Sequence, residues 1–392
     1  MKTLMLVCGE PSGDQLGAQL MAAIKKMTGD RIRIVGVGGA AMAQQGLESL
    51  YPLDATAVMG LREVVPAVPR ILARVRQAAD YAIRIHPDAL VVIDSPDFTH
   101  RIARAVKKRD PTIKTVNYVA PQVWASRAYR AKAMARYFDL ILALFPFEVS
   151  FFKKYGLKAA FVGHPVIERR AMMTGGAEFR ARHGIQMHAP LLVLLPGSRT
   201  SEIRFIFPIF RKAVELLAKN ISGLVTVLPT VPHVTEKVCE AAIDWPTPLH
   251  IVESEAGKFA AFDAADVALA ASGTVTAELA LARTPMVVAY RVGDLTYALA
   301  HRLMTVPYMT LINILLNRRA VPEFKQYEAM PQVLAAEVEG LLRDSHLRAA
   351  QTAAMDEFAH ALGEGGEAPS LRAAKVLLSF IGEARPLAPD SA

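Results

Sequence analysis

Two stretches of the sequence combine an apolar run, a glycine turn and groups that bind anions. The first is the run 191–195, which stops at Pro196-Gly197 and is followed by Ser198 and Arg199. A continuous apolar run that ends in a tight turn is typical of a buried parallel strand. Gly197 lets a ligand approach the backbone, and an arginine matches a phosphate with two parallel hydrogen bonds. We therefore expect half of an anion-binding site here, although a loop with a solvated arginine would have the same composition.

The second stretch repeats this arrangement further along the chain. The apolar run 267–271 enters a short hydroxyl-rich turn of Ser272, Gly273 and Thr274, after which a helix is expected. Backbone N–H groups at a helix start suit a diphosphate, and Thr274 or Thr276 could cap the helix. Glu278, about one turn into the helix, could accept hydrogen bonds from the two hydroxyls of a ribose, or it could only favour the helix dipole.

Acidic residues follow two strands in the first half of the chain. The run 89–93 leads into Asp94-Ser-Pro-Asp97, and the run 3–8 leads into a turn that ends at Asp14. This opening turn is not G-x-G-x-x-G, so the dinucleotide fingerprint is absent. Asp97 is a candidate general base at a strand's carboxyl end, but Ser-Pro-Asp also favours an ordinary turn. The spacing of Asp94 and Asp97 does not suit an Asp-x-Asp metal clamp, and no histidine pair has ligand spacing, so we expect no metal and no cofactor.

Apolar runs alternate with helical patterns along the whole chain, which predicts an α/β fold of two doubly wound halves with a ligand in the cleft between them. The expected strands are 3–8, 32–37, 89–93, 115–119, 140–144 and 160–162 in the first half, and 191–195, 224–228, 249–252, 267–271 and 286–289 in the second. We expect an N-terminal domain over 1–165 and a C-terminal domain over 166–345. Helices over 346–384 are expected to pack back on the first domain, and 385–392 form a tail.

Composition indicates a basic and unusually apolar protein. The 392 residues carry a formal net charge of +8 and are 52% hydrophobic, and the mean hydropathy is +0.25. This combination fits a protein that contacts an anionic membrane surface. Nucleic acid is the weaker explanation of the charge, because no nucleic-acid motif accompanies it and only 7% of the residues are aromatic.

The sequence also bears on the cellular compartment. The start Met1-Lys2-Thr3 leads straight into a strand pattern, so we expect no secretory signal peptide. We expect no membrane-spanning helix, because no uncharged apolar run is long enough. Two cysteines, Cys8 and Cys239, in apolar surroundings favour a reducing compartment without a disulfide framework.

A set of motifs occurs in a characteristic order along nearly the whole chain. The motifs are Gly9–Asp14, Met59–Val64, Ile93–Phe98, Tyr118–Ala125, Phe145–Glu148, Gly163–Pro165, Leu195–Arg199, Ala271–Thr274, Pro285–Arg291 and Asn313–Gln326. Taken in order, they resemble the motifs of lipid-A-disaccharide synthase, and no single one decides the match. The chain departs from the family pattern at Ala120, Gln122 and Ser126, where a serine, a small hydroxyl residue and a tryptophan usually stand. These departures leave the acceptor or acyl-chain preference open.

The resemblance implies a GT-B glycosyltransferase, an α/β protein with two Rossmann-like domains facing a cleft, and an inverting mechanism. It implies UDP-2,3-diacylglucosamine as donor and 2,3-diacylglucosamine 1-phosphate, called lipid X, as acceptor. The products would be a β-1,6-linked disaccharide 1-phosphate and UDP, formed in lipid A biosynthesis. The expected location is the cytoplasmic face of the inner membrane of a Gram-negative bacterium.

The matched motifs also suggest roles for single residues. Asp97 would be the catalytic base, with Glu10 and Asp14 as second candidates or as ligands of acceptor hydroxyls. The donor would be bound by Gly197, Ser198, Arg199, Ser272, Gly273, Thr274, Thr276 and Glu278, and the acceptor by Gly13, Asp14, Trp124, Arg127 and Asn317. A UDP-sugar epimerase on the same fold and a transferase for another acylated sugar stay open as alternatives.

Two stretches have the character of a membrane-contacting surface. One is Met59–Val75, an apolar stripe beside Arg62, Arg70 and Arg74, and the other is Val306–Leu316, flanked by Arg302, Arg318 and Arg319. In both, the apolar side chains could instead belong to the core or to a homodimer contact. The expected partners are the anionic membrane surface and, if one stretch is a dimer contact, a second copy of the chain.

Overall fold

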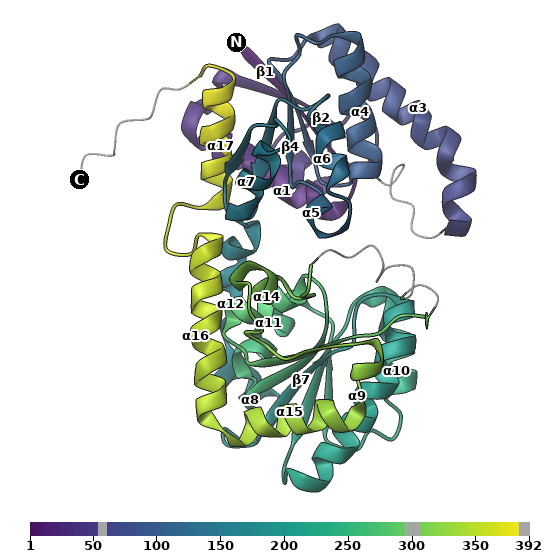
Figure 1. The fold of residues 1–392 in the computed structure, drawn as a ribbon, viewed down its shortest axis with the longest axis vertical. Helices are drawn as coiled ribbons and strands as arrows, with labels where there is room; N and C mark the ends of the chain where they lie inside the picture. Colours follow the sequence, from purple (N-terminus) through teal and green to yellow (C-terminus); the bar gives the residue numbers. More distant parts are fainter. Residues whose placement is uncertain (54–60, 295–296, 298–305, 384–392) are drawn as a thin grey trace, which may run out of the picture. The chain divides into compact units, whose positions relative to one another are not determined.

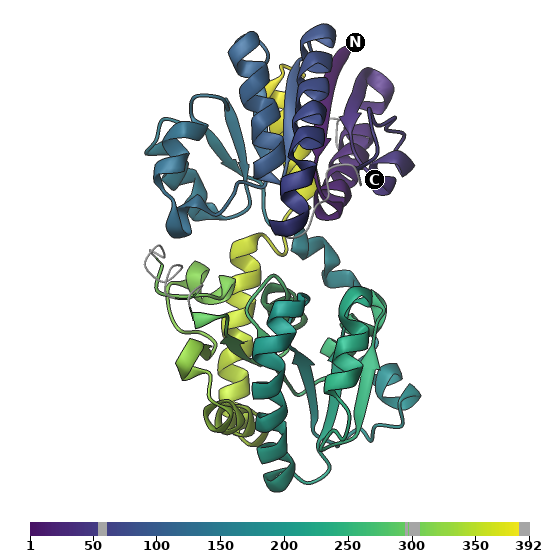
Figure 2. The ribbon, with the colours of Figure 1, turned by 90° about the vertical axis from the view of Figure 1, so that its right-hand side faces the viewer.

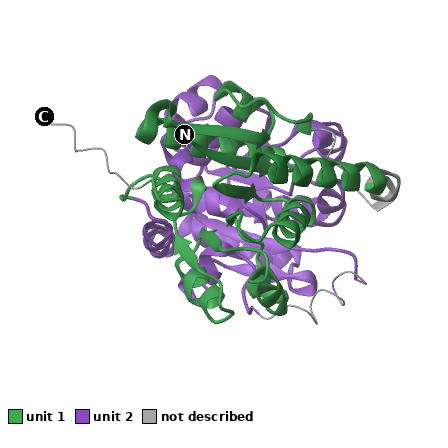
Figure 3. Cartoon of the chain, turned by 90° about the horizontal axis from the view of Figure 1, so that it is seen from above, with its two compact units in different colours: residues 1–165, 365–392 green, residues 166–364 purple. Residues whose placement is uncertain are grey.

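The structure is a computed structural model that describes residues 1–53, 61–294, 297 and 306–383, and of residues 61–67 only the backbone. The chain divides into two compact units (Figure 3). Unit 1 is made of residues 1–165 and 365–392, and unit 2 is made of residues 166–364. The expected tail 385–392 lies outside the described residues.

Unit 1 is built on a six-stranded parallel sheet with helices on both faces (Figures 1 and 2). Its strands are β1 (Lys2–Cys8), β2 (Ile32–Val37), β3 (Ala89–Ile93), β4 (Thr115–Tyr118), β5 (Leu140–Ala143) and β6 (Ala159–Phe161). Its helices are α1 (Pro11–Thr28), α2 (Ala40–Gln44), α3 (Leu61–Ile85), α4 (Pro96–Arg109), α5 (Val123–Ser126), α6 (Tyr129–Met134), α7 (Pro146–Lys153) and α17 (Pro369–Phe380). Every residue of β3 is buried, as expected for a parallel strand covered on both faces.

Unit 2 repeats this architecture with its own sheet. Its strands are β7 (Leu191–Leu195), β8 (Val225–Pro229), β9 (Leu249–Val252), β10 (Val267–Ala271), β11 (Met286–Tyr290) and β12 (Glu323–Lys325). Its helices are α8 (Gly176–Arg182), α9 (Thr200–Asn220), α10 (Pro232–Ala241), α11 (Glu255–Ala264), α12 (Val275–Ala282), α14 (Leu311–Leu316), α15 (Pro331–Arg343) and α16 (Ser345–Leu362). The three-residue strand β12 was not predicted, because its Glu-Phe-Lys sequence has no apolar run.

The strand order reverses once within each sheet. In unit 1 the order is β2-β1-β3-β4-β5-β6, and in unit 2 it is β12-β11-β10-β7-β8-β9. The reversals lie between β1 and β3 and between β7 and β10. Loops leave the carboxyl ends of these neighbouring strands in opposite directions, and the space between them is where open α/β sheets bind ligands.

The helical segment expected over 346–384 is divided between the two units. Gly363, at φ 106°, ends α16 in a left-handed conformation that favours glycine. Helix α16 packs against α12 and α14 of unit 2, whereas α17 packs against α1 of unit 1. The glycine-rich segment 363–368 before Pro369 marks the break between the two helices, but it does not show that the chain changes unit there.

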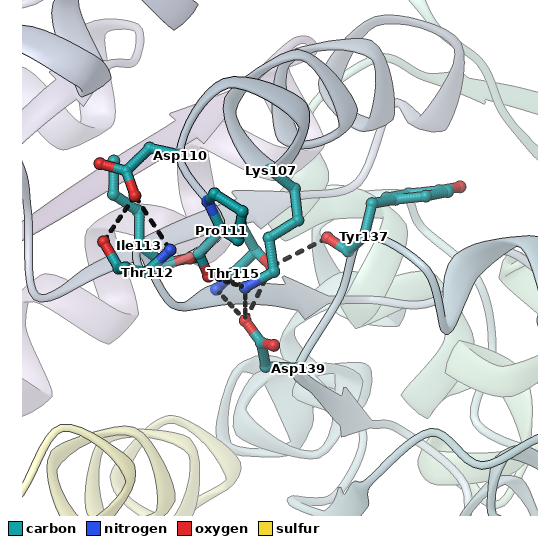
Figure 4. Close-up of polar contacts among 8 residues, drawn as sticks. All are labelled: Lys107, Asp110, Pro111, Thr112, Ile113, Thr115, Tyr137 and Asp139. Carbon is teal, nitrogen blue, oxygen red and sulfur yellow. Dashed lines mark hydrogen bonds and ion pairs between the residues drawn. The ribbon is translucent and has the colours of Figure 1, made fainter.

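Charged residues also stabilise unit 1 at the amino ends of β4 and β5 (Figure 4). Lys107 Nζ donates to Asp139 Oδ2 at 2.7 Å and to the carbonyls of Pro111 and Ile113 at 3.0 and 3.1 Å. The same Asp139 oxygen accepts the N–H of Thr115 at 2.8 Å. This cluster lies at the edge of the sheet opposite to the carboxyl ends, so we assign it to folding.

Candidate active site

The reversal in unit 1 brings together the acidic residues predicted from sequence. Ser95 Oγ donates to Glu10 Oε1 at 2.7 Å, and Ser12 Oγ donates to Asp94 Oδ2 at 3.2 Å. Asp97 lies in the first turn of α4, directly after β3, and its side chain is exposed. Arg101 Nε donates to the Asp97 backbone carbonyl at 2.7 Å. Glu10, before α1, and Asp97, at the start of α4, follow the neighbouring strands β1 and β3 and so lie at the same edge of the sheet.

The backbone around these residues adopts unfavourable conformations. Asp94, Ser95 and Val119 have φ values of 53°, 46° and 66°. Residues other than glycine rarely adopt positive φ, and the cost is highest for a β-branched residue such as Val119. The Asp94 N–H donates to the Tyr118 carbonyl at 3.1 Å, so the two strained segments are linked. Strain of this kind persists where surrounding structure enforces it, and it concentrates at functional sites.

Contacts within the fold explain why unit 1 has these residue types at two of the predicted acceptor positions, Asp14 and Gly13. Asp14 is buried, and its carboxylate accepts the N–H groups of Gly39, Ala41 and Met42 at 2.7, 2.8 and 3.1 Å. It thereby satisfies the free N–H groups at the start of α2. A Cβ on Gly13 would lie 3.0 Å from the Cys8 side chain and 3.2 Å from the Ile93 carbonyl. These contacts account for both residue types without a ligand.

Trp124 is held inside unit 1 by a buried carboxylate. Its Nε1 donates to Glu148 Oε1 at 3.0 Å, and Glu148 Oε2 accepts the N–H groups of Leu144 and Phe145 at 3.0 and 3.1 Å. The Trp124 ring meets Phe147 edge-on at 5.0 Å. Trp124 is only 8% exposed, whereas Arg127, at the end of α5, is exposed. Glu148 was not identified as a partner of Trp124 from the sequence, where it lies 24 residues away.

In unit 2, the turn after β7 is fixed by its own side chains. Glu202 Oε2 accepts the N–H groups of Ser198 and Arg199 at 2.9 and 3.2 Å. Gly197 has φ 112°, and a Cβ there would lie 2.3 Å from Glu202 Oε2, so only glycine fits. The N–H groups of this turn therefore point at Glu202, and a bound anion would meet the side chains of Ser198 and Arg199. The Arg199 side chain is 79% exposed.

The turn after β10 lies on the other side of the reversal in unit 2. Ser272 is partly buried, Gly273 and Thr274 are exposed, and α12 begins directly after them. Neither threonine caps α12 through its hydroxyl, because Thr276 Oγ1 donates to the Gly273 carbonyl at 2.8 Å and Thr274 makes no side-chain cap. The N–H groups of Thr276 and Ala277 donate to the carbonyls of Gly273 and Thr274 at 3.2 and 3.0 Å, so a bound anion would meet the preceding turn rather than these groups.

Glu278 is a buried carboxylate with two cationic partners. Arg169 Nη1 donates to Glu278 Oε1 at 3.0 Å, and Lys258 Nζ donates to Glu278 Oε2 at 2.7 Å. These partners offset the cost of burying the carboxylate, which would be high for an unpaired charge. Each oxygen retains a lone pair for a further donor such as a hydroxyl.

The acceptor set predicted from sequence is split between the units. Asn317 belongs to unit 2, where it ends α14 in a left-handed conformation with φ 51° and is exposed. The nearby Asn313 is fully buried instead. Its Nδ2 donates to Val321 O and Glu323 Oε2, and its Oδ1 accepts the N–H groups of Ala320 and Val321. Asn313 thus stabilises the fold of the 313–326 segment through buried hydrogen bonds.

Comparison with known proteins identifies the family. A sequence model described as Lipid-A-disaccharide synthetase matches residues 4–375. The lipid-A-disaccharide synthase of Rhodospirillum centenum is 44% identical over 378 residues, which cover 96% of this chain and 94% of that protein. This chain belongs to the lipid-A-disaccharide synthase family.

As a member of that family, the chain is a glycosyltransferase of lipid A biosynthesis. Its GT-B fold is shared with more distant solved structures. Staphylococcus aureus MnaA, solved with UDP, matches with a TM-score of 0.65 at 15% identity and covers 98% of both chains. A putative UDP-N-acetylglucosamine 2-epimerase from Listeria monocytogenes matches with a TM-score of 0.66 at 12% identity, covering 99% of this chain and 98% of that one. At these identities the likeness concerns the fold alone.

Two further properties concern only the part of the chain that the structure describes. No group of three or more His, Cys, Asp or Glu side chains among those residues is arranged to hold a metal ion. No described helix combines the length and apolar character needed to cross a membrane.

The buried carboxylate of Glu148 predicts a distinctive pH dependence. Burial raises the pKa of Glu148 from 4.5 to about 7, although Phe145, Trp124 and Leu144 donate to it. Between these two values the folded protein keeps a proton that the unfolded chain releases, so the free energy of unfolding falls as pH rises through this window. Glu148→Gln should remove up to about 3 kcal/mol of this fall.

Urea unfolding at several pH values between 4.5 and 7 measures this difference. Glu48→Gln is the matched control, because Glu48 is an exposed carboxylate in the same unit. Parallel pH profiles for the wild type and Glu148→Gln would contradict the prediction.

Proposed function

We propose that this protein joins UDP-2,3-diacylglucosamine to 2,3-diacylglucosamine 1-phosphate by an inverting transfer, giving a β-1,6-linked disaccharide 1-phosphate and UDP. The observation that carries the proposal is family membership over almost the whole chain. The positions of the site residues support it, because the acidic and anion-binding groups lie at the strand-order reversals of the two sheets.

The donor half of the proposal rests on unit 2. The Arg199 guanidinium and the Ser198 hydroxyl would contact the diphosphate, together with the Ser272-Gly273-Thr274 turn that precedes α12. Glu278 would accept the ribose hydroxyls with its remaining lone pairs, while Arg169 and Lys258 hold it in place. A fixed carboxylate loses little conformational freedom on binding, which favours affinity.

The acceptor half rests on unit 1. The Asp97 carboxylate would take the proton of the acceptor's 6-hydroxyl as the hydroxyl oxygen attacks C1 of the donor sugar. The bond from C1 to the diphosphate oxygen breaks on the opposite face, and UDP leaves with the bonding electron pair. Arg199 stabilises the negative charge that develops on the diphosphate. Glu10, which shares Ser95 with this loop, is the second candidate for the base.

The proposed membrane contact rests on α3, which begins at Leu61. Residues 59 and 60 of the predicted stretch lie outside the described residues. Val68 and Leu72 are 41% and 45% exposed on this helix, beside the exposed Arg70. Ile71, by contrast, packs against the core. Exposed apolar side chains next to arginines suit the boundary between lipid headgroups and acyl chains.

The second stretch, Val306–Leu316, fits a structural role better. Ile312 and Asn313 are fully buried there, and Arg318 makes two hydrogen bonds to Glu357. Arg302 lies outside the described residues. We therefore place the proposed membrane contact on α3.

Mass spectrometry of the products tests the proposed reaction and the base together. Wild-type protein mixed with both acylated substrates should form the disaccharide 1-phosphate and UDP. Asp97→Asn should bind UDP normally and lower turnover by about a hundredfold or more, because it keeps the shape and removes the basicity. Conversion of the UDP-sugar without acceptor into an isomer of the same mass, separated by chromatography, would indicate an epimerase. Near-normal turnover of Asp97→Asn would move the base to Glu10.

The proposed role of Arg199 predicts a loss of UDP affinity. Arg199→Ala should weaken UDP binding by about 1.5–3 kcal/mol, the range for a hydrogen bond to a charged group. Arg199→Lys should restore only part of it, since lysine lacks the planar fork. Isothermal titration calorimetry measures both, with Arg204→Ala as the control on the first turns of the same helix. Unchanged affinity in Arg199→Ala would exclude this contact.

The proposed membrane surface predicts a change in lipid binding. Val68→Ser combined with Leu72→Ser should reduce sedimentation with liposomes containing anionic lipid and leave the thermal midpoint nearly unchanged, because both side chains are exposed. Ile71→Ser is the contrasting variant, since it should lower the thermal midpoint. Undiminished sedimentation of the double variant would rule out this surface.

A further inference from the structure

The peptide bond between Ser198 and Arg199 is held from both sides. Its carbonyl oxygen, on Ser198, accepts a hydrogen bond from His233 Nε2 at 2.7 Å. Its N–H, on Arg199, donates to Glu202 Oε2 at 3.2 Å. A peptide unit is planar, so these two contacts fix the orientation of the whole plane. They thereby fix the direction in which the Arg199 side chain leaves the backbone.

The His233 side chain is exposed, but the helix that carries it is fixed by packing. His233 lies in the first turn of α10, and the neighbouring Val234 and Val238 are buried in the core of unit 2. Residues three to four positions apart lie on one face of a helix. His233 and Lys237 therefore share a face of α10, next to the face that carries the two valines. Lys237 Nζ lies 3.3 Å from Thr200 Oγ1. Helix α10 therefore contacts the 198–200 segment at two points.

Little else orients the Arg199 side chain. It is 79% exposed, and its guanidinium lies 3.4 Å from Glu202 Oε1, a long distance for a charged hydrogen bond. The backbone sets where this side chain starts, so a shift of the peptide unit would move the guanidinium relative to a bound diphosphate. His233, which lies outside the 197–199 turn and outside α9, makes a hydrogen bond to that backbone.

We propose that His233 is a positioning residue for the donor diphosphate and acts through the Ser198 carbonyl on Arg199. This inference rests on the proposed function of the 197–199 turn. Because a carbonyl only accepts, the Nε2 atom must carry a proton, as it does in the Nε2–H tautomer and in the imidazolium. A side chain that donates from the same place should replace histidine, and one that cannot donate should not.

The test compares two variants at this position. His233→Leu removes the donor and keeps an apolar contact, whereas His233→Gln retains an N–H at similar reach. His233→Leu should raise the Kd for UDP and the KM for the UDP-sugar about threefold to tenfold, with kcat at saturating donor within about twofold. His233→Gln should recover most of this loss. Glu236→Gln, an exposed residue of the same helix, is the matched control.

A second arm separates positioning from a general effect on folding. In an Arg199→Ala background, His233→Leu should change the Kd for UDP by less than about twofold, because effects that act through one residue are not additive. An equal loss in both backgrounds, a wild-type Kd in His233→Leu, or equal losses in the Leu and Gln variants would each overturn the proposal. Failure of the wild type to bind UDP at all would instead refute the proposed function of the turn.

Discussion

In a parallel sheet every strand delivers its carboxyl end to the same edge, and the candidate site residues of each unit depend on this constraint. Residues far apart in the sequence meet there only because the intervening helices return the chain to the opposite edge. Glu10 and Ser95, for example, are 85 residues apart and share a hydrogen bond. The reversal of strand order then opens room between two such loops. The direction of the strands therefore determines where the candidate site residues lie in each unit.

Most of the strands could be predicted from sequence because their signals are local. Apolar runs of five residues, such as β3 and β10, are buried throughout, and each is followed by a turn whose composition is visible in the sequence. The carboxyl-edge positions of Asp97, Arg199 and Gly273 follow from this pattern alone. Family motifs added the order of the turns and the chemistry expected of them.

What the sequence could not provide is the pairing of side chains across long separations. Asp14 looked like a ligand for a hydroxyl, yet three N–H groups from 25 to 28 residues away surround it. Glu278 was expected near a ribose, but its partner Arg169 lies 109 residues away. His233 carried no motif at all. Such contacts depend on how helices pack on the sheet, which local periodicity does not encode.

The discontinuity of unit 1 has a consequence for the order of folding during synthesis. Helix α17 covers α1 with the buried residues Ala373, Ala374, Leu377 and Leu378, and Lys114 Nζ donates to the Phe380 carbonyl at 2.8 Å. The ribosome makes α17 only after all of unit 2. Since domains generally fold as units while the chain emerges, unit 2 can complete its core first, although its sequence comes second. Until α17 has been made, one face of α1 stays uncovered. The nascent first unit then exposes apolar surface of the kind that chaperones recognise.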